Sequence, residues 1–210
     1  EARLVREQLA HGDVPLALRS EFRPVRRDRR VEVELAALHE QLPQDSLYTF
    51  GAGNHCIWAQ QFLRSAVYPS QFSVRNGSMG YSVPGAVAAS LNFPDRTVVT
   101  IAGDGEFLMN GQELATAAQY GAKPLVIVMD NQEYGTIRTH QEREYPERVS
   151  GTQLKNPDFA AMAEAFGGFG VRVERDADVP AAVDAALKAV QEEGRFALIH
   201  LIVEQRVKAY

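Results

Sequence analysis

Residues 97–114, TVVTIAGDGEFLMNGQEL, decide the fold. The first six of them are mostly apolar and β-branched, as in a strand that is covered on both faces. The strand stops at Gly103-Asp104-Gly105, where two glycines permit a tight turn, and a helix-like pattern begins a few positions later. A buried strand, a glycine turn and a helix predict one unit of an α/β protein.

The same alternation recurs on both sides of this stretch. Short, near-continuous apolar runs predict strands at 46–50, 72–74, 97–102, 124–129, 170–174 and 196–204. Helix-like patterns lie between them, at 31–42, 55–67, 83–93, 111–121, 157–167 and 178–194. The sequence therefore predicts an α/β fold, a doubly wound parallel sheet with helices on both faces.

Composition restricts the possible functions. The chain has 210 residues, 45% of them hydrophobic and 23% charged, which is ordinary for a globular protein with one core. The net charge of −5 gives no reason to expect nucleic acid or an anionic membrane as a partner. No apolar run approaches the ~18 residues that span a bilayer. The single cysteine, Cys56, predicts no internal disulfide, a cytoplasmic location and a small hydrophobic role for this side chain.

The sequence predicts one main domain with two short tails. Residues 1–31 are rich in arginine and lack an apolar period, so they are interpreted as a linker or tail. Residues 32–205 form the expected domain, and residues 206–210 a C-terminal tail.

Polar, turn-prone residues follow three of the predicted strands, at 51–55, 103–105 and 130–131. Asp104 ends one strand and Asn131 ends the next, with one crossover helix between them. A right-handed crossover brings both side chains to the same edge of a parallel sheet, where such folds bind ligands. Mg²⁺ prefers oxygen ligands and usually bridges to phosphate, so these residues fit a metal–diphosphate site. The alternative is that Asp104 only caps a helix and Asn131 only turns the chain.

At these residues the chain resembles a known family. The segment 103–131, GDGEFLMNGQELATAAQYGAKPLVIVMDN, resembles the Gly-Asp-Gly to Asn signature of thiamine diphosphate-dependent enzymes. Three further segments, 51–62, 76–91 and 134–168, are similar to the diphosphate-binding domain of acetolactate synthase-like enzymes. The resemblance covers roughly residues 32–205 and implies the thiamine diphosphate-binding fold.

The resemblance implies two cofactors, thiamine diphosphate and Mg²⁺, and a set of residues that bind them. The implied metal ligands are the side chains of Asp104 and Asn131 and the backbone carbonyl of Glu133. The implied diphosphate contacts are Gly53, Asn54 and His55, with the backbone N–H groups of Gly105 and Glu106 near the following helix start. The Gly77 carbonyl is the implied acceptor for the aminopyrimidine, and Met79 the apolar prop that bends the cofactor. Tyr134 and Gly135 continue the loop over the phosphates, and the metal ligand Asn131 is also counted among the cofactor contacts.

The resemblance also implies an activity on 2-oxo acids, by decarboxylation or carboligation. The glutamate that activates the cofactor in this family comes from a separate pyrimidine-binding domain, so no catalytic residue is assigned in this chain. That domain is expected upstream in the same polypeptide or on another subunit, and the enzyme is expected to be a homo-oligomer. The competing hypothesis is a non-enzymatic nucleotide- or phosphate-binding module on a Rossmann-like fold.

Two positions depart from the family pattern. His140 stands where acetolactate synthases carry a tryptophan that lines the substrate pocket, so a larger second oxo acid need not be preferred. Asp130 stands where many members have a second asparagine, beside the implied ligand Asn131.

Overall fold

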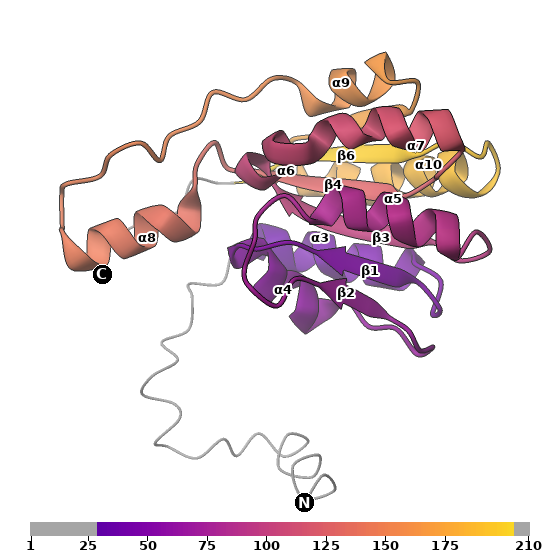
Figure 1. The fold of residues 1–210 in the computed structure, drawn as a ribbon, viewed down its shortest axis with the longest axis horizontal. Helices are drawn as coiled ribbons and strands as arrows, with labels where there is room; N and C mark the ends of the chain where they lie inside the picture. Colours follow the sequence, from indigo (N-terminus) through magenta and orange to yellow (C-terminus); the bar gives the residue numbers. More distant parts are fainter. Residues whose placement is uncertain (1–28, 204–210) are drawn as a thin grey trace, which may run out of the picture.

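The structure is a computed structural model that describes residues 29–203. It contains one sheet of six strands (Figure 1). In chain order these are β1 (Leu47–Phe50), β2 (Gln71–Ser73), β3 (Val98–Gly103), β4 (Leu125–Asp130), β5 (Phe169–Val173) and β6 (Ala197–Ile202).

All neighbouring strands of the sheet are parallel, in the order β2-β1-β3-β4-β6-β5. The predicted doubly wound parallel sheet is therefore confirmed. The chain leaves β1 toward β2 on one side and returns to β3 on the other, so the strand order reverses between β1 and β3. Ligands in such folds bind beyond the carboxyl ends of the strands at this reversal.

Helices fill the connections between the strands. Those in the first half of the chain are α3 (Arg29–Gln41), α4 (Asn54–Phe62), α5 (Ser82–Asn92), α6 (Asp104–Asn110), the 3₁₀ turn η1 (Gly111–Glu113) and α7 (Leu114–Tyr120). Those in the second half are α8 (Gly135–Glu144), α9 (Phe159–Ala165), the 3₁₀ turn η2 (Asp176–Asp178) and α10 (Val179–Gln191).

Two layers of helices cover the two faces of the sheet. Residues of α3, α4 and α10 pack against one set of strand side chains, such as Ile127 of β4. Residues of α5, α6, α7 and α9 pack against the alternate set, such as Val128. Adjacent strand residues thus face opposite apolar layers, which is why the strands read as continuous hydrophobic runs.

Three expectations about helices need correction. The helix after β3 begins at Asp104 itself, not several residues later, so Asp104 and Glu106 lie in its first turn. Helix α4 ends at Phe62, five residues before the expected end. Helix α8 lies in a segment that was expected to be a loop, and none of its residues is buried. In Figure 1, α8 stands at the left, away from the layers that cover the sheet.

The predicted tails fall mainly on residues that the structure does not describe. Residues 1–28 and 206–210 lie outside the described part, whereas Arg29, Arg30 and Val31 form the start of α3. Within residues 29–203, no helix is both long enough and apolar enough to span a membrane.

Candidate functional site

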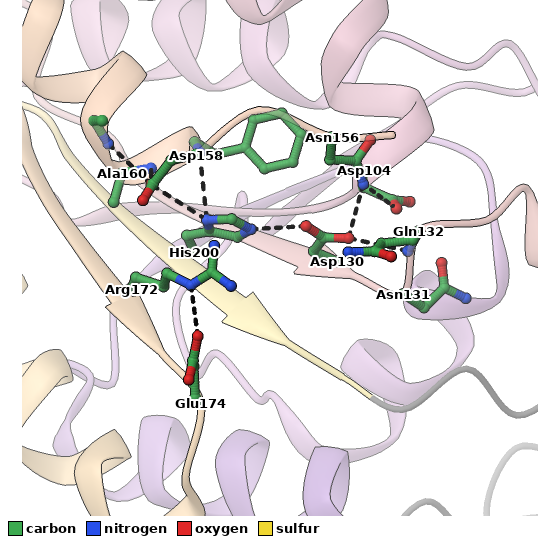
Figure 2. Close-up of polar contacts among 12 residues, drawn as sticks. Asp104, Asp130, Asn131, Gln132, Asn156, Asp158, Ala160, Arg172, Glu174 and His200 are labelled. Atoms are coloured by element: carbon green, nitrogen blue, oxygen red, sulfur yellow. Dashed lines mark hydrogen bonds and ion pairs between the residues drawn. The ribbon is translucent and has the colours of Figure 1, made fainter. Parts of the chain in front are cut away.

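Two buried carboxylates meet where β3 and β4 end. Asp104 begins α6 directly after β3, and Asp130 is the last residue of β4. The side-chain amide of Asn156 donates one hydrogen bond to Asp104 Oδ2 and another to Asp130 Oδ1, both 2.7 Å long. Figure 2 shows the two carboxylates converging on Asn156. The crossover between the strands therefore brings two acids, not only one, to the predicted edge.

The two carboxylates differ in their environments. Burial, and to a lesser extent the nearby Asp130, raises the pKa of Asp104 to about 6, against the hydrogen bonds from Asn156 and the Gly105 N–H. Burial also acts to raise the pKa of Asp130, but hydrogen bonds from His200, Asn156 and the Gln132 N–H hold it below its usual value. An ionised Asp104 therefore lies beside another negative charge in a buried place, where a cation is favourable.

His200 anchors this pair to the sheet. Its side chain is fully buried in β6, and Nδ1 accepts a hydrogen bond from the Phe159 N–H (3.3 Å). The proton of a neutral His200 therefore sits on Nε2, which donates to Asp130 Oδ2 (2.8 Å). The Phe159 ring packs edge-on against the imidazole, with 4.9 Å between the ring centroids. Asp158 caps α9 at the same place by accepting from the Ala160 and Ala161 N–H groups.

The residues at this edge fit a metal ion bound by oxygen atoms. Asn131 follows β4, and its Oδ1 accepts from the Glu133 N–H (3.1 Å), while no hydrogen bond joins it to Asp104. The Glu133 carbonyl accepts from the Gly135 N–H (2.8 Å) and keeps a second lone pair. Among the described residues, Asn156 Oδ1 is buried without a hydrogen-bond partner. Hard oxygen donors of this kind, with an uncompensated buried acid, suit Mg²⁺.

The Glu133 side chain takes no part in the cluster of Asp104 and Asp130. It is buried and forms an ion pair with Arg138 of α8. Glu133 also forms an isolated antiparallel bridge with Gln153, and the Tyr134 N–H donates to the Thr152 carbonyl (2.8 Å). These contacts join the two ends of residues 134–152, the excursion from the sheet that carries α8.

A second cluster joins the predicted diphosphate loop to α6. His55 Nε2 lies 3.0 Å from Glu106 Oε2, and the two side chains are 9% and 1% exposed. A Cβ on Gly53 or Gly103 would come within 3.0 Å of the His55 ring, so these glycines let the imidazole lie against the backbone. Cys56, which is half-buried, packs against the core and hydrogen-bonds through its sulfur to the Gly51 carbonyl at 3.5 Å. The sequence predicts a small buried hydrophobic cysteine; the side chain packs against the core but is only half-buried.

The pKa of His55 rises to about 9. Burial acts to lower this pKa, but the Cys56 thiol and the Glu106 carboxylate outweigh it. His55 is therefore cationic at neutral pH, in the loop that the resemblance assigns to the diphosphate.

We expect this ion pair to make the stability of the protein depend on pH. A folded-state pKa near 9, above the usual histidine value of 6.5, means that the contribution is complete below pH 6.5 and is lost as the pH rises through 9. The difference corresponds to a free energy on the order of 3 kcal/mol. Urea unfolding between pH 6 and 10 and an NMR titration of the His55 ring measure the two quantities. A ring that titrates near 6.5 would contradict this assignment.

The other predicted cofactor contacts lie on exposed or half-exposed turns. Gly77 is exposed at a φ of 70°, which explains the glycine, and a Cβ there would meet nothing within 4 Å. Asn54 is exposed at the start of α4, and Met79 is half-buried just before α5. The Gly105 N–H, expected to face the diphosphate, donates to Asp104 Oδ1 in this structure (2.8 Å).

Tyr134 and Gly135 do not continue a loop as expected. Gly135 is the first residue of α8 and Tyr134 precedes it. The Tyr134 ring packs over Gly105, where an added Cβ would lie 2.3 Å from the ring. His140, the residue in place of the family tryptophan, is exposed on α8 and contacts Arg143 through Nδ1 (3.0 Å).

Sequence reasoning missed three members of the site. Asn156 and His200 were not singled out, because their partners lie far away along the chain. Asp158, which caps α9, was not singled out either. One signal was present: His200 interrupts the apolar strand ALIHLI, and a buried polar side chain in a strand needs a partner.

The chain is similar to a known family of proteins. Residues 51–201 match the family model "Thiamine pyrophosphate enzyme, C-terminal TPP binding domain". The acetolactate synthase isozyme 2 large subunit of Escherichia coli is 36% identical over 174 residues, which is 81% of this chain and 31% of that protein. The acetolactate synthase large subunit of Parasynechococcus marenigrum is 42% identical over 144 residues, or 68% of this chain and 23% of that one.

Solved structures show the same fold. Benzoylformate decarboxylase from Polynucleobacter necessarius superposes with a TM-score of 0.75 at 23% identity, over 85% of this chain and 34% of that one. The 4-hydroxybenzoylformate decarboxylase of Rhodococcus jostii also gives 0.75, at 25% identity, over 86% of this chain and 33% of that one.

The chain thus spans less than a third of the length of the two curated relatives. The family match, in contrast, covers most of the described residues and contains the ends of β1, β3 and β4, where the acidic and histidine clusters lie. The chain therefore belongs to the family of thiamine pyrophosphate enzymes and carries the family's C-terminal TPP-binding domain.

Proposed function

We propose that this chain binds the diphosphate of thiamine diphosphate through Mg²⁺, as part of an acetolactate synthase-like enzyme that acts on 2-oxo acids. The observation that carries the proposal is the meeting of Asp104 and Asp130, two buried acids that share the Asn156 amide, at the ends of β3 and β4. This edge lies beside the reversal of strand order, where the fold binds ligands.

Each half of the site has a distinct task in this proposal. Asp104, Asn131 and the Glu133 carbonyl would hold Mg²⁺, with Asn156 keeping the Asp104 carboxylate in place. His55, cationic at neutral pH, and the turn at Gly53 and Asn54 would bind the diphosphate, since opposite charge is favourable in a buried site.

The remaining contacts would orient the organic part of the cofactor. The Gly77 carbonyl would accept from the aminopyrimidine, and Met79 would support the rings from below. Tyr134, packed over Gly105, would exclude water from the phosphate end. Thiamine diphosphate supplies the electron sink that cleavage of a 2-oxo acid requires, whereas the protein supplies orientation and electrostatics.

Three finer expectations belong to the same proposal. A pyrimidine-binding domain, upstream or on another subunit, would complete the site, and the enzyme would be a homo-oligomer. His140, exposed on α8, would leave the wall of the substrate pocket less bulky than a tryptophan does. A cytoplasmic location stays a prediction from the single cysteine.

Calorimetric titration of the 210-residue chain separates this proposal from a nucleotide-binding module. We expect thiamine diphosphate to bind only when Mg²⁺ is present, and ATP and NAD to bind at least ~10-fold more weakly. Binding of ATP or NAD in preference to thiamine diphosphate would overturn the proposal and favour the alternative. The chain itself should release no carbon dioxide from pyruvate until a pyrimidine-binding domain is supplied.

A further inference from the structure

The Glu106 carboxylate makes contacts that its place at a helix start does not explain. Its side chain is 1% exposed, and Oε1 accepts hydrogen bonds from the Gly80 and Ser82 N–H groups, both at 3.3 Å. Oε2 lies 3.0 Å from His55 Nε2. One side chain therefore touches both the turn that follows β1 and the turn that precedes α5.

Gly51 provides independent evidence that the fold leaves room for this carboxylate at a fixed position. A Cβ added at Gly51 would lie only 1.5 Å from Glu106 Oε1, so the carboxylate occupies the space of a side chain at position 51. Gly51 is absent from the glycines with positive φ, so its backbone does not require glycine. The glycine is explained by the carboxylate that lies against it.

The two turns joined by Glu106 belong to different halves of the proposed cofactor site. Residues 51–55 carry the proposed diphosphate contacts, and residues 77–82 carry Gly77 and Met79, the proposed pyrimidine contacts. A buried carboxylate is costly unless it is paired, and an apolar side chain would fill the same space at lower cost. The groups that pair with the Glu106 carboxylate are His55, in the diphosphate half of the site, and the Gly80 and Ser82 N–H groups, in the pyrimidine half.

We propose that Glu106 is a positioning residue that fixes the pyrimidine turn relative to the diphosphate turn. It acts through the backbone N–H groups of Gly80 and Ser82 on one side and through His55 on the other. The inference rests on the proposed function and extends it, because Glu106 was expected to contribute its backbone N–H only. The spacing of the two turns matters, since a misplacement of about 1 Å in a bound reactant can lower the reaction rate ~100-fold.

Three variants of the 210-residue chain test this role. Glu106→Ala removes the acceptor, and Gly51→Ala leaves the glutamate in the chain but displaces its carboxylate. Glu106→Gln keeps an oxygen for Gly80 and Ser82 and an amide that can donate to a neutral His55, so it should rescue. Glu113→Gln is the control, because Glu113 lies in the following turn and bonds only to Thr116 among the described hydrogen bonds.

The probes are thiamine diphosphate and inorganic pyrophosphate, each titrated with Mg²⁺. Pyrophosphate engages only the diphosphate half, so its affinity reports any loss of the His55 charge, and the ratio of the two affinities reports the position of the pyrimidine turn. The affinity for thiamine diphosphate should fall ~10-fold or more relative to that for pyrophosphate in Glu106→Ala and Gly51→Ala, and this ratio should stay within ~3-fold of the parent in Glu106→Gln and Glu113→Gln. A role in charge alone would make Glu106→Gln as weak as Glu106→Ala.

A second readout needs no cofactor. The amide NMR signals of Gly80 and Ser82 should shift in Glu106→Ala and Gly51→Ala but not in Glu113→Gln. Unmoved amides, or full thiamine diphosphate affinity in both alanine variants, would overturn the positioning role and leave the proposed function intact. Equal losses for both probes would show a structural role instead. A parent chain that binds pyrophosphate but not thiamine diphosphate would overturn both proposals.

Discussion

Replacement of Asp104 by alanine should abolish Mg²⁺-dependent binding of thiamine diphosphate. Asp104 is the only carboxylate among the proposed metal ligands, and loss of residues that merely support a ligand already costs ~10–100-fold in metal affinity. We therefore expect a loss of more than ~100-fold, measured by calorimetric titration at pH 7.5. Asp184→Ala, at an exposed position of α10, is the matched control and should bind as the parent does.

The same variant should leave the ligand-free protein stable. At pH 7.5 the ionised Asp104 lies beside Asp130, and its pKa near 6 shows that the folded state disfavours this charge. The loss of the hydrogen bonds from Gly105 and Asn156 is thus offset by removal of a buried charge and of its repulsion from Asp130, and the free energy of unfolding should change by less than ~1 kcal/mol. Parent-like affinity in a stable Asp104→Ala chain would refute the metal site.

Replacement of His200 by alanine should have the largest effect on stability. The change leaves Asp130 without its imidazole partner, leaves the Phe159 N–H without an acceptor and opens a cavity beside the Phe159 ring. Each buried polar group left without its partner costs ~1–3 kcal/mol, and more when it is charged, so the free energy of unfolding should fall by at least ~2 kcal/mol. Urea unfolding at pH 7 measures this free energy.

An exposed histidine gives the control for that measurement. His140→Ala, on α8, should change the free energy of unfolding by less than ~0.5 kcal/mol. If His200→Ala costs less than ~1 kcal/mol, His200 does not anchor Asp130 to the sheet as described.

The sheet was predictable because its signal is local. Each strand carries its own apolar run, so β3 and β4 could be located without knowledge of their neighbours, and parallel order follows from the helices between them. The side-chain network was not predictable in this way. Asn156 joins Asp104 and Asp130 across separations of 52 and 26 positions, and His200 reaches Asp130 across 70. Such contacts depend on the register of strands, which no local pattern encodes.

Helix α8 and Glu106 show two other limits of prediction from the sequence. Helix α8 has no buried residue, so the apolar period that reveals amphipathic helices is absent from its sequence. Glu106 could be placed at a helix start from sequence, but the direction of its side chain depends on the space that Gly51 leaves. The proposed ligands Asp104, Asn131 and Glu133 stay predictions until metal binding is measured.

The closed base of the α8 excursion has an evolutionary consequence. Hydrogen bonds from the Tyr134 N–H to the Thr152 carbonyl and from the Leu154 N–H to the Gln132 carbonyl pin its two ends together, while no residue of α8 is itself buried. Length and composition between these pins can drift without disturbing the sheet, since surface segments with fixed ends tolerate insertion at little thermodynamic cost. Selection can therefore remodel this excursion separately from the acidic cluster at the ends of β3 and β4.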